Sequence, residues 1–260
     1  MIIPALLKIE KLRAKFIHSI KQNYFDELDI SIPIDDEYWA KLFRNDSYDS
    51  FSEIFIQNEY SGFIPDIELN RVIDLGAHHG FFSVWLQSNR PPQKIKSLLV
   101  EPSARCFPVL SELTKRKEYN SFTFFNKCIG DPEAGENLFF DRPHMAASKY
   151  KNDDTEVPEK VSVLTPKDIF EWQQPPYDLL KCDIEGAEFS LFKHYTRILL
   201  NTKFIILEWH DRKSVKLLKN EFKNLNFSII KNSVSDHSIE SDKINSGIFL
   251  AQNNNLSMNE

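Results

Sequence analysis

Glycine and cysteine are scarce in this sequence, with seven and three residues of these types among 260. Cys106, Cys128 and Cys182 are widely spaced and form no CxxC pair, which argues against a disulfide framework and against a zinc site. We expect these thiols to be reduced and buried in a cytoplasmic protein. A glycine in mid-chain costs backbone entropy, so we look for a turn or a close approach wherever two glycines lie near each other.

Long apolar runs and an excess of basic charge are also lacking. No stretch approaches the roughly 18 uninterrupted apolar residues of a membrane span. The opening MIIPALLK has neither the basic segment nor the apolar length of a signal peptide, so we expect a cytoplasmic location. The formal net charge of −6 speaks against a protein that binds nucleic acid by neutralising its phosphates.

The chain is interpreted as an arm over residues 1–65, a main domain over 66–252 and a frayed tail over 253–260. The arm is expected to be helical or irregular. Its residues 5–21 have helical apolar periodicity with basic residues on the other side. Docking on the chain's own domain or on a second subunit, as a homo-oligomer, is the favoured reading, and association with an anionic membrane is the less favoured one.

From residue 71 onward, short apolar runs alternate with longer helical periods, which is typical of βαβ units around a parallel sheet. Strands are expected over residues 71–75, 95–100, 121–128, 177–183, 203–209, 226–231 and 246–251. Helices are expected over residues 80–89, 104–117, 166–173, 187–199 and 211–224. Residues 137–141 and 160–164 are expected to form an additional β pair around a polar loop. The sequence thus predicts one α/β domain.

The first strand runs into VIDLGAHHG, a tight turn between strand and helix, which is where an open α/β sheet binds its ligand. Gly76 and Ala77 are expected to let the backbone approach a ligand, and Gly80 to let the helix pack closely on the strand. The spacing D-x-G-x-x-x-G lacks one glycine of the dinucleotide pattern, and Asp74 stands just before the turn. A carboxylate there repels phosphate and suits a cationic group, so Asp74 is expected to orient an amino group.

The second strand ends in LLVEP, which places Glu101 at its carboxyl end. An acid at this position can accept hydrogen bonds from both hydroxyls of a ribose. Pro102 ends the strand, and Ser103 is expected to cap the helix that follows. Together the two strand ends predict a pocket for an adenosine that carries an amino-acid tail and no phosphates. S-adenosylmethionine fits that description.

The fourth strand leads into a block rich in carboxylates, YDLLKCDIEGAE. Strand alternation would place Lys181, Asp183 and Glu185 on one side. Glu188 is expected in the first turn of the next helix, where a negative charge is favourable. These groups would lie beside the sulfonium, although an ion-paired cap on the sheet edge explains them too.

The segments VIDLGAHHGFFS, LLVEP, YDLLKCDIEGAE and FIILEWH, in this order, resemble the FkbM family of S-adenosylmethionine-dependent methyltransferases. The resemblance covers about residues 50–210, including IFIQNEYSG upstream of the first strand. It implies a Rossmann-like class I fold, with a mostly parallel seven-stranded sheet, helices on both faces and an antiparallel seventh strand. It also implies methyl transfer, usually to a hydroxyl of a sugar or natural product. The family commonly has asparagine where this chain has His78.

Methyl transfer to a hydroxyl needs collinear positioning and removal of a proton. Asp183 is expected to orient the acceptor hydroxyl or face the sulfonium, while His210 or Glu208 takes the proton. The cofactor-binding residues are expected to be Asp74, Gly76, Ala77, Gly80, Glu101, Pro102 and Ser103, and the substrate-binding residues Glu185, Lys181 and His144.

Three alternatives stay open at the level of sequence. Mg²⁺ among the carboxylates is less favoured than a site without metal. The acceptor, expected to be a saccharide or another small molecule, could instead be a peptide or a lipid. The chain could also be a nucleotide-dependent oxidoreductase or a non-catalytic binding module on a similar sheet.

Overall fold

The computed structural model describes residues 29–34, 37–43, 47–90, 94–141, 157–234 and 246–256. The helix expected at residues 5–21, with the oligomer or membrane contact assigned to it, lies outside the described residues. So does His144.

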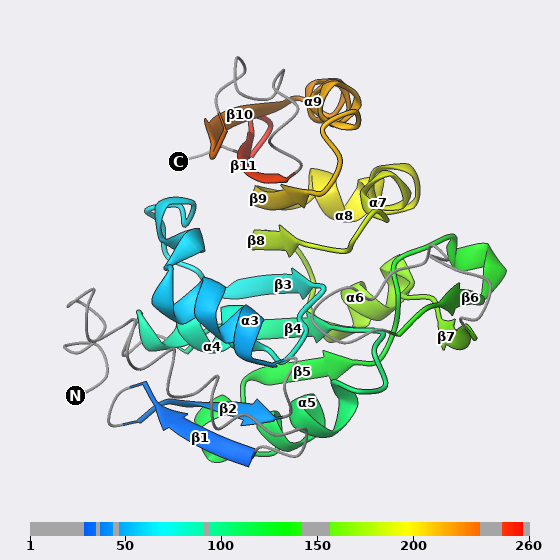
Figure 1. Ribbon diagram of the computed structural model, residues 1–260. Helices are drawn as coiled ribbons and strands as arrows, with labels where there is room; N and C mark the ends of the chain where they lie inside the picture. Colours follow the sequence, from blue (N-terminus) through cyan, green and yellow to red (C-terminus); the bar gives the residue numbers. More distant parts are fainter. Residues whose placement is uncertain are drawn as a thin grey trace.

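A seven-stranded sheet forms the centre of the molecule, as expected from the sequence (Figure 1). Its strands follow the order β10-β11-β9-β8-β3-β4-β5. They are β3 (Arg71–Leu75), β4 (Lys96–Val100), β5 (Phe122–Phe125), β8 (Tyr177–Cys182), β9 (Thr202–Trp209), β10 (Phe227–Asn232) and β11 (Gly247–Asn253). Neighbouring strands from β5 to β9 pair in parallel, whereas β11 is antiparallel to both β9 and β10.

Helices cover both faces of the sheet. Successive apolar side chains of a strand point to opposite faces, so both faces need to be covered. Val72 belongs to the apolar core on the face of the helix that follows β3, and its neighbour Ile73 belongs to the core on the opposite face. One face carries α4 (Phe81–Ser88) and α5 (Phe107–Leu113), and the other carries α6 (Pro166–Trp172), α7 (Glu188–His194), α8 (Thr196–Leu200) and α9 (Val215–Asn224). The helix expected over 187–199 is thus two helices, α7 and α8.

The arm was expected to be helical or irregular, and that prediction is wrong for residues 29–43, which contain a β hairpin. Strand β1 (Asp29–Pro33) pairs antiparallel with β2 (Trp39–Phe43). Ala40 and Leu42 are buried while Lys41 between them is partly exposed, an alternation of period two that two short strands hardly reveal. Their side chains belong to the same apolar core as α4.

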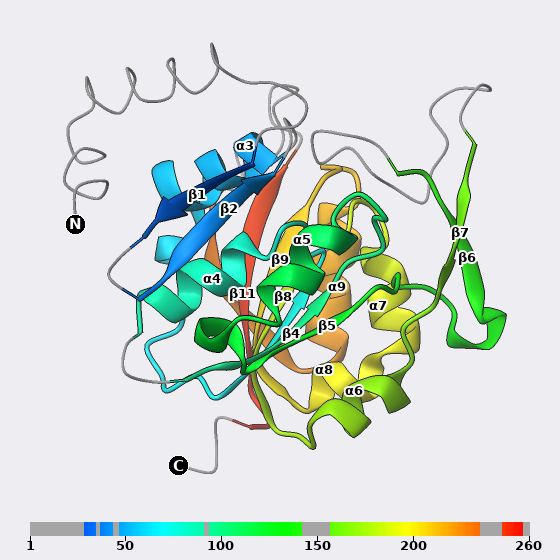
Figure 2. The ribbon, with the colours of Figure 1, turned by 90° about the horizontal axis from the view of Figure 1, so that it is seen from below.

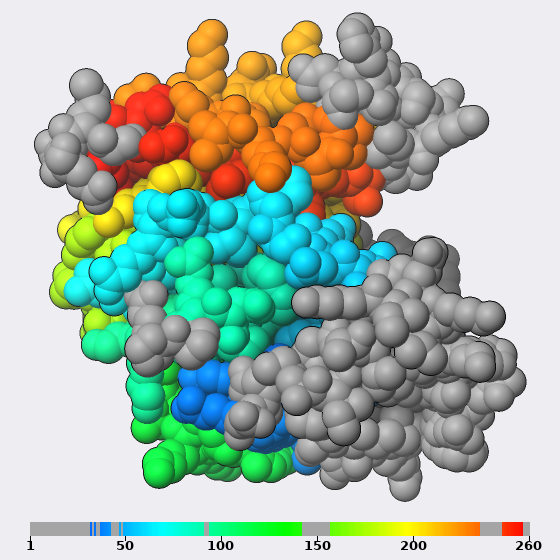
Figure 3. Space-filling view, turned by 90° about the vertical axis from the view of Figure 1, so that its left-hand side faces the viewer, coloured from blue at the N-terminus to red at the C-terminus, as the bar shows by residue number. Residues whose placement is uncertain are grey.

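Between the hairpin and the sheet, the chain forms α3 (Ser47–Phe51), a π-helical turn η1 (Ser52–Ile56) and a 3₁₀ turn η2 (Glu59–Gly62). In Figure 3 the cyan surface of this segment adjoins the orange and red surface of the last two strands. The Lys231 ammonium of β10 donates to the carbonyl of Gly62, and it lies 5.5 Å from the centre of the Phe63 ring. Segment 47–62 therefore ends in contact with β10, an edge strand of the sheet.

Two short helical turns, η3 (Lys117–Tyr119) and η4 (Pro132–Ala134), flank β5. Beyond them the expected additional β pair is present as β6 (Glu136–Phe139) and β7 (Glu159–Ser162), which are antiparallel and project from the main body (Figure 2). The frayed tail was expected to begin at residue 253, but Asn253 is the last residue of β11. It is 1% exposed, and its side-chain amide donates to two backbone carbonyls. Among the described residues, no helix is both long and apolar enough to cross a membrane.

Candidate active site

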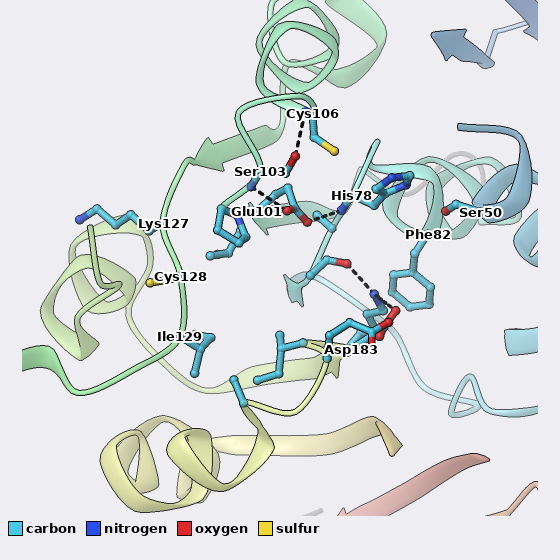
Figure 4. Close-up of a pocket in the computed structure, with 18 of the residues that line it drawn as sticks. Ser50, His78, Phe82, Glu101, Ser103, Cys106, Lys127, Cys128, Ile129 and Asp183 are labelled. Atoms are coloured by element: carbon cyan, nitrogen blue, oxygen red, sulfur yellow. Dashed lines mark hydrogen bonds and ion pairs between the residues drawn. The ribbon is translucent and has the colours of Figure 1, made fainter. Parts of the chain in front are cut away.

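A cavity opens at the carboxyl ends of β3, β4 and β8, with about 1040 Å³ of empty space when open solvent is included (Figure 4). Eight of the residues expected at the site line it: Gly76, Ala77, Glu101, Pro102, Ser103, Lys181, Asp183 and Glu185. Asp74, Gly80, Glu208 and His210 do not line it. Figure 4 shows Lys127 and Ile129 at one end of the cavity and Asp183 at the other, with Glu101 between them.

The turn after β3 is tight enough to require its glycines. Gly76 has a φ of +73°, and a β-carbon added to it would lie 1.6 Å from the backbone oxygen of Asp183. Gly80 has a φ of +78°, and its added β-carbon would lie 2.8 Å from the Leu113 side chain of α5. Gly76 thus lets β3 and β8 end side by side, and Gly80 seats the first turn of α4 against α5.

Glu101 is 7% exposed and is held by backbone amides on both of its carboxylate oxygens. The amide of His78 donates to Oε2 at 2.8 Å, and the amide of Ser103 donates to Oε1 at 2.9 Å. Burial raises the pKa of Glu101 to about 7, although these two hydrogen bonds oppose the shift. Each oxygen keeps a second lone pair, so this carboxylate can still accept two hydroxyl donors from the cavity.

Asp74 lies behind the turn and is completely buried. The Ser83 hydroxyl of α4 donates to its Oδ2 at 2.9 Å, and its Oδ1 is 3.6 Å from Nζ of Lys181. Burial raises the pKa of this carboxyl. Since Asp74 does not face the cavity, the structure assigns it to holding α4 and Lys181, and any action on a ligand's amino group is indirect.

Ser103 differs in detail from the expected helix cap. Its hydroxyl accepts from the amides of Arg105 and Cys106 and so caps a turn that precedes α5, which begins at Phe107. The same hydroxyl donates to Asp141 at 2.7 Å. The residue therefore fixes the loop beside Glu101 and lines the cavity at the same time.

Lys181 is a buried cation that joins the ends of β3 and β8. Its ammonium donates to the Gly76 carbonyl at 2.8 Å and to Asp183 Oδ2 at 3.2 Å. Burial disfavours the charged ammonium, but the carboxylates of Asp183, Asp74 and Glu208 outweigh it and raise the pKa of Lys181. This geometry supports a counter-ion to the acids, although the side chain also lines the cavity.

His210, the residue after β9, is surrounded by four carboxylates. Its Nε2 lies 3.4 Å from Asp183, 3.5 Å from Glu185 and 3.6 Å from Glu208, and its Nδ1 lies 3.7 Å from Glu188. Burial disfavours the charged ring, but the carboxylates prevail and raise its pKa to about 9. His210 is therefore an imidazolium at neutral pH. It cannot take a proton there without first losing one, which weighs against its expected role as the base.

Glu208 and Glu185 hold their protons more tightly than ordinary carboxyl groups. Burial raises the pKa of Glu208 to about 8 and that of Glu185 to about 7. One donor atom each from Asp183, Glu185 and His210 lies within 4.8 Å of the others, where the Mg²⁺ alternative would place its ion.

Two functional candidates escaped the sequence analysis, and both come from segment 47–62. The Tyr60 hydroxyl donates to Glu208 at 2.8 Å, and Glu53 lines the cavity, where burial raises its pKa to about 7. Neither residue belongs to a strand end. The sequence signal nearest to them was the segment IFIQNEYSG, which contains Tyr60 and directly follows Glu53.

The raised pKa values predict an unusual pH dependence of stability. In Glu53, Glu185 and Glu208 the folded state keeps protons that the unfolded state releases, so their effect lowers stability as pH rises from about 4.5 to 8. The stability contributed by His210 is complete below 6.5 and is lost as pH rises through about 9. Thermal melts of the ligand-free protein should show a midpoint roughly 5 °C lower at pH 9 than at pH 6. The variant Glu208→Gln should flatten this slope, and a midpoint that rises with pH would contradict the assignment.

Comparison with known proteins adds three findings. Residues 74–229, more than half of the chain, match the family model described as Methyltransferase FkbM domain. The crystal structure of methyltransferase FkbM from Methylobacillus flagellatus KT is similar, with 15% identity and a TM-score of 0.50, and the match covers 79% of this chain and 50% of that one. This chain therefore spans about half the length of that protein. No curated protein gives a significant match.

Two other solved structures are more distant. TrmK of M. capricolum, in complex with S-adenosyl-homocysteine, has 12% identity and a TM-score of 0.47, over 77% of this chain and 68% of that one. Precorrin-6y C5,15-methyltransferase from Geobacter metallireducens GS-15 has 10% identity and a TM-score of 0.45, over 76% and 87%. The family match begins at Asp74 and ends in β10. It contains every residue that lines the cavity except those from segment 47–62. By that match the chain belongs to the FkbM methyltransferase family.

Proposed function

We propose that the protein is an S-adenosylmethionine-dependent methyltransferase that acts on a hydroxyl of a small-molecule or saccharide acceptor. The observation that carries the proposal is Glu101, a buried carboxylate at the end of β4. Both of its oxygens are oriented by backbone amides, and both retain a lone pair for a ribose hydroxyl.

The cavity fits the charge distribution of this cofactor. Gly76 leaves room for close approach at the turn, and Glu101 would hold the ribose. When bound, the cofactor supplies an electrophilic methyl group on a positively charged sulfur. Asp183 and Glu185, which line the same cavity, would stabilise that positive charge. The same carboxylates would repel the pyrophosphate of a nicotinamide dinucleotide, which disfavours the oxidoreductase alternative.

The acceptor's hydroxyl must be oriented and must lose its proton. Asp183 lies where β8 meets the cavity and would orient the hydroxyl, a form of positioning that corresponds to effective molarities of about 10⁵–10⁸ M. Of the two expected bases, Glu208, which accepts a hydrogen bond from Tyr60, has the lower pKa, about 8 against about 9 for His210, so as pH rises it is the first of the two to become free to accept the proton. The His210 imidazolium would hold Asp183 and Glu208 in place by charge.

The test begins with cofactor binding. Calorimetry with S-adenosylhomocysteine should show one site per chain, and mass spectrometry should then detect methylated small molecules after incubation of a metabolite extract with S-adenosylmethionine. In Asp183→Asn, product formation should fall roughly 100-fold or more, while the affinity for S-adenosylhomocysteine changes less than about tenfold. Absence of binding by the unaltered protein would refute the proposal. Binding without any methylated product would favour a non-catalytic module. Methylated peptides or lipids among the products would show that the acceptor is a peptide or a lipid.

A further inference from the structure

The side chains of two histidines and one cysteine meet in the wall of the cavity. His78 and His79 belong to the turn between β3 and α4, and Cys106 belongs to the loop between β4 and α5. One donor atom from each of these three side chains lies within 4.8 Å of the other two. Figure 4 shows the sulfur of Cys106 on the side of its loop that faces His78. The methyl transfer proposed above uses none of the three side chains.

The backbone of the turn brings the two imidazole rings together. In an extended chain, the side chains of neighbouring residues point in opposite directions. His78 instead has a left-handed φ of +48°, and the centre of its ring lies only 4.0 Å from the centre of the His79 ring. A left-handed backbone is unfavourable for residues with a β-carbon and persists only where the surrounding structure holds it. The pairing of the rings is therefore built into the turn.

The cluster is mostly shielded from water. His79 and Cys106 are each 2% exposed, and His78 is partly buried. The amide of Cys106 donates to the Ser103 hydroxyl, which fixes the cysteine in its loop. Side chains that are already held in place lose little freedom when they bind an ion, so the cluster is preorganised for a ligand.

Two imidazoles and a thiolate form a donor set that suits zinc. Bond lengths of about 2.0–2.1 Å to nitrogen and about 2.3 Å to sulfur place the donor atoms of a tetrahedral site about 3.3–3.7 Å apart. From separations within 4.8 Å, each donor atom has to move inward by about 1 Å or less, which rotation of the side chains can supply. The lack of a CxxC pair argues against a site made of cysteines, but here histidines supply two of the three ligands.

We propose that His78, His79 and Cys106 bind a zinc ion. Both rings would be neutral, and the thiol would release its proton to solvent as the zinc–sulfur bond forms. His78 and Cys106 line the cavity, so the fourth position of the ion would open toward it. The ion would link the turn after β3 to the loop after β4. These two segments supply the amides that hold Glu101, so zinc would also steady that carboxylate.

Cobalt substitution tests the site, because a thiolate bound to Co²⁺ gives a charge-transfer band in the near ultraviolet. The reduced full-length protein is stripped of metal with a chelator and titrated with Co²⁺. One equivalent should produce this band together with the visible absorption of a four-coordinate ion, and one equivalent of Zn²⁺ should remove both. A site made of carboxylates and histidine, such as Asp183, Glu185 and His210, contains no thiol and cannot give the band.

The cysteine variants provide a matched pair. Cys106→Ser should lose the charge-transfer band, and its affinity for Zn²⁺, measured by competition with Co²⁺, should fall more than about tenfold, since even the outer partners of a metal site contribute about 10–100-fold. Cys128→Ser removes another buried thiol that lines the same cavity and should retain both the band and the affinity. If Cys106→Ser keeps the band, the inference is overturned.

His78→Asn decides the matter if Cys106→Ser does not fold. Asparagine tolerates a left-handed backbone, and the variant keeps the backbone amide that donates to Glu101. Its affinity for Zn²⁺ should also fall more than about tenfold. An affinity equal to that of the unaltered protein would overturn the inference.

Thermal melts give an independent readout of the same site. Zn²⁺ at about 100 times its dissociation constant should raise the melting midpoint of the unaltered protein by about 5–10 °C, and excess chelator should reverse the rise. No stoichiometric binding of Co²⁺ or Zn²⁺ by the unaltered protein would overturn the inference and leave the proposed methyl transfer untouched. The proposed function is tested separately, by the binding of S-adenosylhomocysteine.

Discussion

Replacing Gly76 with alanine is expected to abolish cofactor binding and to destabilise the protein severely. The new methyl carbon would lie 1.6 Å from the backbone oxygen of Asp183, a position that no rotamer change can relieve. The loop after β8 would have to move, and with it the hydrogen bond from the Asp183 amide to the Leu75 carbonyl. We expect a loss of about 3 kcal/mol or more in the free energy of unfolding, measured by denaturant titration, and no detectable heat with S-adenosylhomocysteine.

Gly135→Ala is the matched control for this change. Gly135 has a φ of +72°, almost equal to that of Gly76, but nothing lies within 4 Å of its added β-carbon. At a ψ of −46° it lies outside the left-handed helical region, so the variant should show only the strain of a sparsely populated backbone conformation, about 1–3 kcal/mol, and bind the cofactor normally. If both variants lost the same stability, the clash with Asp183 would not be what makes Gly76 necessary.

Replacing Glu101 with alanine is the second large change. The variant removes the acceptor for the buried amides of His78 and Ser103, and it also removes the proposed contact to the ribose. We expect the dissociation constant of S-adenosylhomocysteine, measured by calorimetry, to rise about 100-fold, equivalent to about 2.8 kcal/mol. The dissociation constant of Glu101→Gln should fall between those of the unaltered protein and of Glu101→Ala, because its amide oxygen can accept one of the two backbone hydrogen bonds.

Thermal melts separate a binding effect of Glu101→Ala from a loss of fold. Glu171→Ala provides the baseline for removing an exposed glutamate, since its ion pair with Lys167 is 3.6 Å long and open to solvent. A folded Glu101→Ala protein that still bound S-adenosylhomocysteine at its original affinity would show that the ribose is held elsewhere. That result would remove the main support for the proposed function.

The sheet and its ligand-binding edge could be predicted from sequence because their signals are local. The runs over residues 71–75 and 95–100 stop close to Gly76 and Pro102, and all seven strands expected for the sheet are present. Gly76 and Glu101 stood at those ends, and both line the cavity. The residue type also indicated the chemistry there, since a carboxylate at a strand end has few structural uses.

The direction of individual side chains and their charge states could not be predicted in this way. Asp74 lies opposite Leu99 in the register of β3 and β4, so Glu101 lies two residues further toward the carboxyl edge of the sheet. Only Glu101 faces the cavity, whereas Ser83 and Lys181 hold Asp74 behind the turn. The charge of His210 depends on four carboxylates from two stretches of chain, residues 183–188 and Glu208 in β9. Glu53 comes from a segment without a periodic pattern, and its contact with the site exists only in three dimensions.

The position of β11 also bears on how the protein is made. This strand is the last described element of the chain, but it fills an interior place in the sheet, between β9 and β10. A nascent chain cannot close that gap until residue 253 has left the ribosome, and until then β9 and β10 expose unpaired edges. A stop codon before Gly247 would therefore remove an interior strand, so all cavity residues would still be encoded but the sheet would be incomplete.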